Sequence, residues 1–340
     1  MMDLMILMRP ITRSKSKLPL ILGIMAVFVL TSGCHRAGAY RPLSQAVESP
    51  AQGATVVAVY QPWFGDPEHI KVGYTTDDPA VLRRQIAKAK DLGVQVFAVD
   101  WYGERRPFLD RSYALMQLVA SQNRFKVALM YDETEEDTGH ATEESLAAMT
   151  KAYESYLRPG APGRNAYLEY NGRPVIFIFP KRGRTDWNRV RAQVDNWPVP
   201  PLLFYKDDPP PQYANAFDGN YAWVHPSREW MQDGSDWGKE YLEAFYKKMQ
   251  SRPDKISVGT AWPGFDDTKA SWSLDRHIDE RCGKTFEDTL RIFHSYNHVK
   301  PMPFLMIATW NDYEEGTAIE SGVGQKCAGP ATNGSHRDGL

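Results

Sequence analysis

The sequence predicts a single (β/α)8 barrel of the TIM type, an α/β fold, and three observations support this prediction. Apolar, β-branched runs recur eight times between Thr55 and Thr309, and several are separated by helical segments. The runs are nearly continuous rather than alternating, which is typical of parallel strands buried on both faces. The chain has 340 residues, 42% hydrophobic and 24% charged. This globular composition excludes a disordered or collagen-like chain.

The eight runs are short enough to be strands. They are Thr55–Tyr60, Val94–Asp100, Lys126–Tyr131, Pro174–Phe179, Leu202–Tyr205, Gly219–Val224, Ile256–Thr260 and Phe304–Thr309. A doubly wound open sheet is the alternative arrangement. No Gly-rich phosphate-binding loop follows any of the runs, which favours the barrel.

Helical periodicity occupies several of the connections between these runs. Apolar residues recur at helical spacing over Asp78–Leu92, with Pro79 suited to the first turn and Gly93 to the end. Further predicted helices are Phe108–Ser121, Glu143–Tyr156, Ser235–Gln250, with Ser235 as N-cap, and Lys284–His294. The prolines at 209–211 predict a crossover without a full helix. The 31 residues after Thr309 show little helical pattern, so the last helix is expected to be short or missing.

The N-terminal residues are typical of an export signal. Four basic residues and one acid precede Leu18–Leu30, an uncharged and mostly apolar run of 13 residues. That length suits a signal peptide and is short for a lasting transmembrane helix. Thr31, Ser32 and Gly33 then lead to Cys34. This arrangement resembles the lipobox of bacterial lipoproteins, in which the Cys becomes a lipidated N-terminus, although Thr31 stands where that family prefers Leu.

We therefore expect a signal peptide over residues 1–33, a flexible tether over 34–53 and the barrel domain over 54–340. The expected product is an exported lipoprotein of the bacterial cell envelope, on the outer membrane or facing the periplasm. An ordinary secretory signal or a single membrane anchor is the alternative. Cleavage removes four positive charges and one negative charge, which moves the formal net charge from −2 to −5. Such a chain has no basic surface for nucleic acid.

The remaining cysteines agree with export. Once Cys34 is assigned to lipid, Cys282 and Cys327 remain, and two thiols in an oxidising compartment predict one disulfide. Two unpaired buried thiols are the alternative. No Cys/His spacing resembles a zinc site, and neither a metal nor a cofactor is expected.

The tryptophans indicate where a site should lie. Five of the 10 Trp fall just past the predicted strands, at the end where barrels of this type build their active sites: Trp63, Trp101, Trp223, Trp262 and Trp310. The other five, at 187, 197, 230, 237 and 272, are expected in helices or loops without a functional role. Carboxylates accompany four of the five strand-end groups. Flat apolar faces beside carboxylates suit a sugar ring, whereas the alternative is that these Trp fill the core.

Asp312 and Glu315 form the strongest candidate pair. Glycoside cleavage needs two carboxyl groups, one protonated and one ionised. Residues three apart on one turn can face the same ligand. The alternative is that Asp312 caps a helix whose first turn contains Glu315.

Four motifs resemble those of known families. They are YQPWFG at 60–65, VDWYG at 99–103, GFDDT at 264–268 and TWNDYEEGT at 309–317. Over about residues 55–320 the sequence resembles glycoside hydrolase families 99 and 71, which hold endo-acting α-mannosidases and α-1,3-glucanases. The resemblance implies a (β/α)8 barrel that cleaves α-mannan or α-glucan. By resemblance, Glu315 is the general acid, and Asp312 is the partner that acts on water or on a sugar hydroxyl.

Two positions depart from these patterns. Family 99 has Glu where this chain has Asp312, whereas family 71 has Asn-Asp-Tyr-Gly-Glu, which matches Asn311, Asp312, Tyr313 and Glu315. Glu314 fits neither pattern. A non-catalytic glycan-binding or polysaccharide-assembly lipoprotein is therefore the alternative function.

The resulting prediction is a monomeric glycosidase whose partners are an α-linked glycan and, through its lipid anchor, a membrane. The predicted substrate-binding residues are Tyr60, Trp63, Asp100, Trp101, Tyr102, Tyr131, Asp132, Trp223, Trp262, Asp266, Asp267, Trp310 and Asn311.

Overall fold

The computed structural model describes residues 53–134, 139–182, 184–225 and 234–323. The predicted signal peptide, Cys34, nearly all of the tether and Cys327 lie outside the described residues. The lipid anchor and the disulfide therefore stay predictions. Among the residues that the structure describes, no helix is both long and apolar enough to cross a bilayer.

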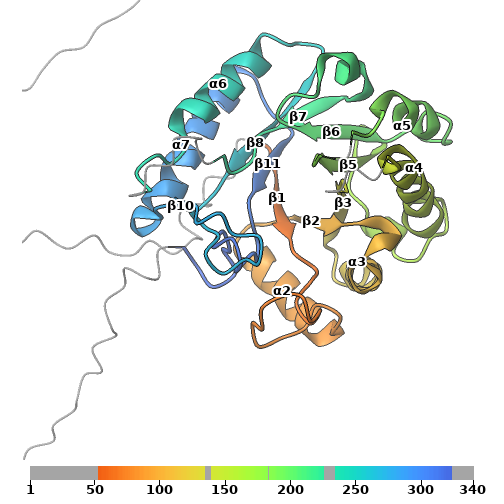
Figure 1. Ribbon diagram of the computed structural model, residues 1–340, viewed down its shortest axis with the longest axis horizontal. Helices are drawn as coiled ribbons and strands as arrows, with labels where there is room; N and C mark the ends of the chain where they lie inside the picture. Colours follow the sequence, from red (N-terminus) through yellow and green to blue (C-terminus); the bar gives the residue numbers. More distant parts are fainter. Residues whose placement is uncertain (1–52, 135–138, 183, 226–233, 324–340) are drawn as a thin grey trace, which may run out of the picture. The chain divides into compact units, whose positions relative to one another are not determined.

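Eight parallel strands close into a ring, which confirms the predicted (β/α)8 barrel (Figure 1). The strands are β1 (Thr55–Tyr60), β2 (Val96–Trp101), β3 (Lys126–Asp132), β5 (Arg173–Phe179), β6 (Leu202–Lys206), β7 (Gly219–Tyr221), β8 (Ile256–Ala261) and β11 (Phe304–Ile307). β11 pairs with β1, so that Phe304 lies opposite Thr55, and β3 pairs directly with β5. The short β4 (Glu169–Tyr170) adds to β5 in antiparallel orientation.

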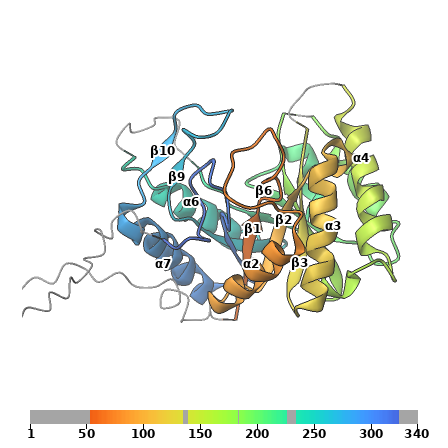
Figure 2. The same cartoon turned by 90° about the horizontal axis from the view of Figure 1, so that it is seen from below.

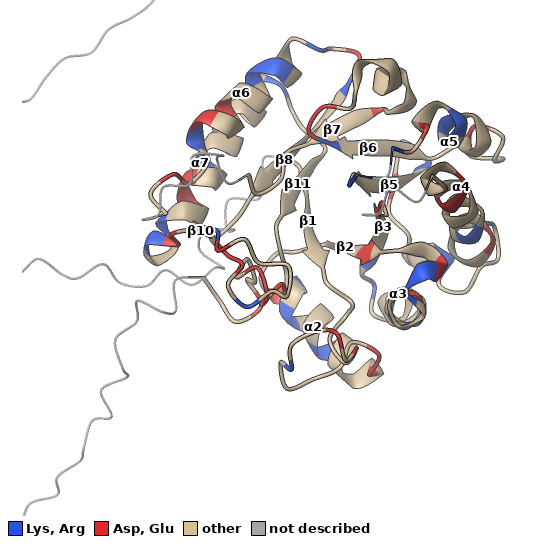
Figure 3. Cartoon of the chain, in the orientation of Figure 1, with Lys and Arg blue, Asp and Glu red and all other residues tan. Residues whose placement is uncertain are grey.

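The apolar runs form these strands because both of their faces are covered. All residues of β2 and β11, and all but the first of β1, are buried. Burial on both faces selects β-branched and aromatic side chains, as in the sequence of β1, TVVAVY. Charged residues of both signs lie on the outer helices α6 and α7, whereas β1, β8 and β11 carry none (Figure 3).

Helices form the layer outside the ring (Figure 2). They are α2 (Pro79–Asp91), α3 (Pro107–Gln122), α4 (Ala141–Ala152), α5 (Trp187–Val194), α6 (Lys239–Gln250) and α7 (Lys284–Val299). The start of α2 follows the sequence signals. Asp78 accepts a hydrogen bond from the Ala80 N–H at 2.7 Å, and Pro79 occupies the first helical position.

Two details of the helix prediction were wrong. Ser235 is not an N-cap, since α6 begins only at Lys239, after Gly238 in the left-handed region at φ 89°. Helix α5 was not predicted, because only Trp187, Val190 and Val194 of its eight residues are buried. The Pro-rich crossover forms only the 3-10 turn Pro211–Ala216, as predicted, and the described chain after β11, up to Val323, contains no helix.

Two long connections lie at one end of the barrel. The β1–α2 loop spans residues 61–78. The β8–α7 connection spans residues 262–283 and contains the antiparallel strands β9 (Phe265–Asp266) and β10 (His277–Ile278). Both follow the carboxyl ends of their strands, where a barrel builds its site.

Candidate active site

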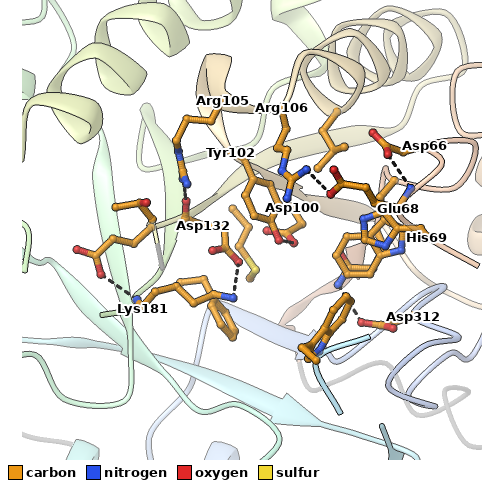
Figure 4. A pocket seen from close by; sticks show the side chains of 18 of the residues that line it. Asp66, Glu68, His69, Asp100, Tyr102, Arg105, Arg106, Asp132, Lys181 and Asp312 are labelled. Carbon is orange, nitrogen blue, oxygen red and sulfur yellow. Dashed lines mark hydrogen bonds and ion pairs between the residues drawn. The ribbon is translucent and has the colours of Figure 1, made fainter. Parts of the chain in front are cut away.

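A cavity of about 510 Å³ lies at the carboxyl ends of the strands (Figure 4). Its lining comes from the segments that follow β1, β2, β3, β5, β7, β8 and β11. Seven predicted site residues line it: Trp63, Asp100, Tyr102, Asp132, Trp223, Asp312 and Glu315. The candidate carboxyl pair therefore shares one cavity with two of the five strand-end tryptophans.

Asp312 is buried and held in place by both of its oxygens. Oδ1 accepts the backbone N–H groups of Glu314 at 3.1 Å and Glu315 at 2.9 Å, which shapes the turn. Oδ2 accepts a hydrogen bond from Gln61 Nε2 at 3.4 Å. Asp312 thus has both of the positions predicted from the Asp-x-x-Glu spacing: it caps the turn, and it lines the cavity.

Glu315 lies three residues further on and is held from a different element. The indole N–H of Trp272, in the loop between β9 and β10, donates to Glu315 Oε1 at 3.1 Å. The backbone carbonyl of Glu315 accepts from the Asp266 N–H at 2.8 Å, next to that loop. The β8–α7 connection therefore fixes both the main chain and the side chain of the candidate acid.

Burial changes the acidity of this pair. It raises the pKa of Asp312 well above its usual range, and the nearby Glu315 carboxylate adds to the rise, while the two backbone N–H groups oppose it. Burial also raises the pKa of Glu315, against the lowering effect of the Trp272 N–H, Arg276 and Lys181. A pair that holds protons more tightly than carboxyl groups in water is suited to deliver one to a leaving oxygen.

A second pair of carboxyl groups, Asp100 and Asp132, faces the same cavity (Figure 4). Lys181 Nζ lies 3.5 Å from Asp132 Oδ2, and Tyr102 donates to Asp100 Oδ2 at 3.2 Å. Burial raises the pKa of Asp100 well above its usual range, with a further rise from Asp132 that Lys181 partly offsets. Asp100 Oδ1 has no hydrogen-bond partner among the described residues.

Three rings, those of Trp63, His69 and Trp272, form an aromatic wall of the cavity beside the candidate pair. The rings of Trp63 and His69 stack with centroids 4.5 Å apart and an interplanar angle of 2°. Trp272 meets Trp63 edge-on at 6.0 Å and His69 at 6.1 Å. Since His69 covers one face of Trp63, the wall contains an imidazole that the sequence motifs did not indicate.

Three predicted site residues point away from the cavity and anchor the barrel to its helices. Tyr60 donates to Gln85 in α2 at 2.6 Å, and Trp101 donates to Asp110 in α3 at 3.0 Å. Tyr131 shares a hydrogen bond of 3.2 Å with Ser145 in α4. Because side chains alternate along a strand, it is the neighbours of these residues that line the cavity: Gln61, Asp100, Tyr102, Met130 and Asp132.

Five further predicted residues have structural roles: Trp262, Trp310, Asn311, Asp266 and Asp267. Trp262 is fully buried and donates to the Trp237 carbonyl, and Trp310 is fully buried and lies 5.3 Å from Phe97. Asn311 exchanges two hydrogen bonds with the Gln61 main chain.

The acids of the GFDDT motif organise their own loop. Asp266 accepts from Thr268, and Asp267 accepts from Ser273, Leu274 and Arg276.

Sequence reasoning missed much of the lining. The cavity is also lined by Gln61, Asp66, Glu68, His69, Arg105, Arg106, Leu109, Met130, Glu133, Thr134, Glu144, Phe179, Lys181, Ser271 and Trp272. Trp272 in particular was assigned no function. The strand-end motifs contained a signal for Gln61, whereas His69 and Trp272 lie in loops whose path only the fold determines. Within the described ranges, no group of three or more His, Cys, Asp or Glu could hold a metal ion.

The sequence matches the profile of glycosyl hydrolase family 71 over residues 69–325, about three quarters of the chain. The chain belongs to glycosyl hydrolase family 71. The matched region includes Asp312, Glu315 and most of the cavity lining, whereas Tyr60 and Trp63 precede it. A search of curated proteins finds no match.

Solved structures share the fold of this family 71 chain. Two structures of a GH99 endo-alpha-mannosidase from Bacteroides thetaiotaomicron superpose with a TM-score of 0.60. They are 18% and 19% identical, and the alignment covers 78% of this chain and 86% or 87% of theirs. A glycoside hydrolase-like protein superposes with a TM-score of 0.56 at 14% identity, covering 79% of this chain and 87% of its own.

Proposed function

We propose that the protein hydrolyses internal bonds of an α-linked polysaccharide of the α-mannan or α-glucan type. The observation that carries this proposal is the position of Asp312 and Glu315, two carboxyl groups of one turn that line one cavity, the first buried and the second half-buried. Membership of family 71 and a fold shared with an endo-alpha-mannosidase support the type of linkage and the internal attack.

Each carboxyl group has a distinct role in this proposal. Glu315 donates its proton to the glycosidic oxygen as the bond from that oxygen to the anomeric carbon breaks. Asp312 takes a proton from the attacking water, or from the sugar hydroxyl that attacks in its place. In the second case water then opens the anhydro sugar, with its proton passing to Glu315 and the proton on Asp312 returning to the hydroxyl. The Glu314 and Glu315 N–H groups and Gln61 Nε2 keep the Asp312 carboxylate in a fixed orientation during this step.

The rest of the cavity would bind the glycan. Asp100, Asp132 and Lys181 supply hydrogen-bonding groups on one side, and the wall of Trp63, His69 and Trp272 supplies apolar ring faces on the other. A pyranose ring has hydroxyl groups around its edge and a C–H face, so such a lining suits it.

A non-catalytic glycan-binding protein is the second candidate. The observation that favours it is that Asp312 Oδ1 is already occupied by two backbone N–H groups, as expected of a turn-forming aspartate. This candidate predicts binding of the same glycans without release of oligosaccharides.

The test incubates the mature protein with α-mannan and with α-1,3-glucan and measures released oligosaccharides. We expect release by the wild type, and a loss of about 10²–10⁴-fold in Glu315→Gln and in Asp312→Asn, which lack the proton donor or its partner. Both variants should still bind the glycan. Asp275→Asn, an exposed position in the neighbouring loop, is the matched control and should remain active.

Full activity in Glu315→Gln would contradict the role of that residue. Binding without release by the wild type would support the glycan-binding candidate instead.

A further inference from the structure

The side chain of Glu314 has no part in the proposed hydrolysis, yet it is only 2% exposed. A buried carboxylate is stable only when it is paired. Oε1 accepts the Ile70 N–H at 3.0 Å, and Oε2 lies 2.8 Å from His69 Nδ1. Since an ionised carboxylate can only accept, Nδ1 carries the proton and donates it. Both partners belong to the β1–α2 loop, so Glu314 ties this loop to the segment that carries the candidate acid.

The imidazole that Glu314 holds is part of the cavity wall. His69 stacks flat on Trp63, and its side chain is 13% exposed. Its hydrogen bond to the described part of the chain runs through Nδ1 and leaves Nε2 available. The ring therefore presents a polar edge that can exchange a hydrogen bond with a ligand hydroxyl.

Two consecutive glutamates thus hold two neighbouring rings. Glu314 bonds to His69, Glu315 bonds to the Trp272 indole, and these rings meet edge-on at 6.1 Å. These contacts link Glu314 through His69 and Trp272 to Glu315, the candidate acid that follows it in the chain. A change in the position of His69 would change the wall that lies against Glu315.

We propose that Glu314 is a positioning residue that holds His69 as the sugar-contacting side chain of the subsite beside Glu315. Recognition there combines the stacked His69–Trp63 pair with one hydrogen bond from the imidazole edge to a pyranose hydroxyl. The inference rests on the proposed function for its ligand, an α-linked glycan. The geometry of the Glu314–His69 contact does not depend on catalysis.

The kinetic test compares Glu314→Ala, Glu314→Gln and His69→Gln. Glu314→Ala removes both oxygens that accept hydrogen bonds from the β1–α2 loop. We expect the KM of this variant to rise about tenfold, the equivalent of about 1.4 kcal/mol of ground-state binding. Its kcat should stay within about twofold, since both candidate catalytic carboxyl groups remain. Glu314→Gln can still accept from Ile70 and contact the imidazole, so it should recover much of the loss.

A double variant and a matched control sharpen the test. The double variant Glu314→Ala/His69→Gln should have a KM no higher than the single variant with the higher KM, because the two residues act through one contact. Glu320→Gln is the control. Glu320 lies in the same segment as Glu314 and accepts hydrogen bonds from Tyr74, Tyr313 and Gln85. It does not line the cavity, so the KM of this variant should be unchanged.

A second measurement separates this inference from the proposed function. In protein labelled with ¹⁵N-histidine, the Nδ1 of His69 should appear as a protonated nitrogen in the wild type and should shift in Glu314→Ala. If the wild type hydrolyses no glycan, the proposed function fails and the same variants are compared by glycan-binding affinity. An unchanged His69 signal in Glu314→Ala, or a fall in kcat with KM unchanged, would overturn the inference.

Discussion

Asp100 and Asp132, two carboxyl groups at the cavity, differ in the groups that compensate their charge. Asp132 lies 3.5 Å from the Lys181 ammonium, whereas Asp100 has a tyrosine hydroxyl on one oxygen and no described partner on the other. The pKa of Asp100 is therefore raised by burial and by Asp132. Folding must remove this group from water whether or not it is charged, and the neutral form loses less.

The stability of the protein should depend on pH through Asp100. The folded state keeps its proton above pH 3.8, the ordinary pKa, where the unfolded state has lost it. The contribution is therefore unpenalised below that pH and becomes less favourable as pH rises toward the folded pKa. Asp100→Asn, which cannot ionise, should gain unfolding free energy relative to the wild type between pH 5 and 8, by at most about 1.4 kcal/mol per pH unit.

Denaturant unfolding at several pH values measures this difference, and Asp288→Asn is the control. Burial alone would raise the pKa of Asp288, but Lys284, Arg291 and Arg281 together hold it below its usual value. Asp288 is thus ionised in both states from pH 5 to 8, and its variant should differ from the wild type by a constant amount. A constant difference for Asp100→Asn as well would contradict the raised pKa.

Residue identity alone could not separate site from core at the strand ends. The motifs located the correct end of the barrel, and Asp100, Asp132, Asp312 and Glu315 do line the cavity. The large aromatic residues beside them mostly do not, because a strand residue next to a cavity-facing one points toward the helices. Trp101 illustrates this, since it follows Asp100 and bonds to α3.

At the level of elements, the β9–β10 connection depends on one aspartate. Asp267 is fully buried and accepts hydrogen bonds from the Ser273 hydroxyl, the Leu274 N–H, and both the N–H and Nε of Arg276. Although burial raises the pKa of Asp267, these donors hold it below its usual value. They fold the loop so that Trp272 reaches Glu315.

Asp267→Asn should therefore weaken activity without unfolding the barrel. Asparagine loses the ion pair with Arg276 and part of the acceptor capacity, which costs about 1.5–3 kcal/mol for a charge-assisted bond. We expect kcat/KM to fall at least about tenfold as Trp272 loosens its contact with Glu315. Far-ultraviolet circular dichroism should remain that of the wild type. Asp275→Asn changes an exposed residue of the same loop and serves as control; an equal loss there would argue against Asp267 as the organising residue.

The elements that could be predicted from sequence are those with a strong pattern of their own. All eight barrel strands were found because their runs are apolar on both faces. Helix α5 was missed because only three of its residues are buried, although Asp186 before Trp187 is an N-cap signal that bonds to Asn188 and Arg189. The two-residue strands β9 and β10 have no periodicity to detect, since they depend on Asp267 and on the barrel beneath them.

For the molecule as a whole, we propose export and attachment to a membrane through lipid on Cys34. The supporting pattern is the basic N-terminus, the apolar run Leu18–Leu30 and the small residues before Cys34. Cys34→Ser should release the protein from the membrane fraction of a bacterial host into the soluble exported fraction, measured by immunoblot after fractionation. Metabolic labelling with a fatty-acid analogue should mark the wild type only. Labelling of Cys34→Ser to the same extent would contradict lipidation at this residue.

The fold of the whole barrel was predictable because closure follows from repetition. Eight similar units, each a buried strand and a connection, can bury both faces of every strand by forming a ring. The site was less predictable, because each unit contributes through a different loop. The sequence indicated the candidate pair and the position of the cavity, whereas the wall of His69 and Trp272 required the folded paths of two connections.

The seam between the first and last strands has a consequence for how the protein is made. Gln61 exchanges two hydrogen bonds with Asn311 and one with Asp312, across 250 and 251 residues of sequence. Neither half of the barrel contains both sides of the candidate site. A nascent chain therefore acquires its complete cavity only after Glu315 has been synthesised, because a contact across the seam needs both of its partners. Fragments that stop short of that point lack the carboxyl pair and one side of the cavity.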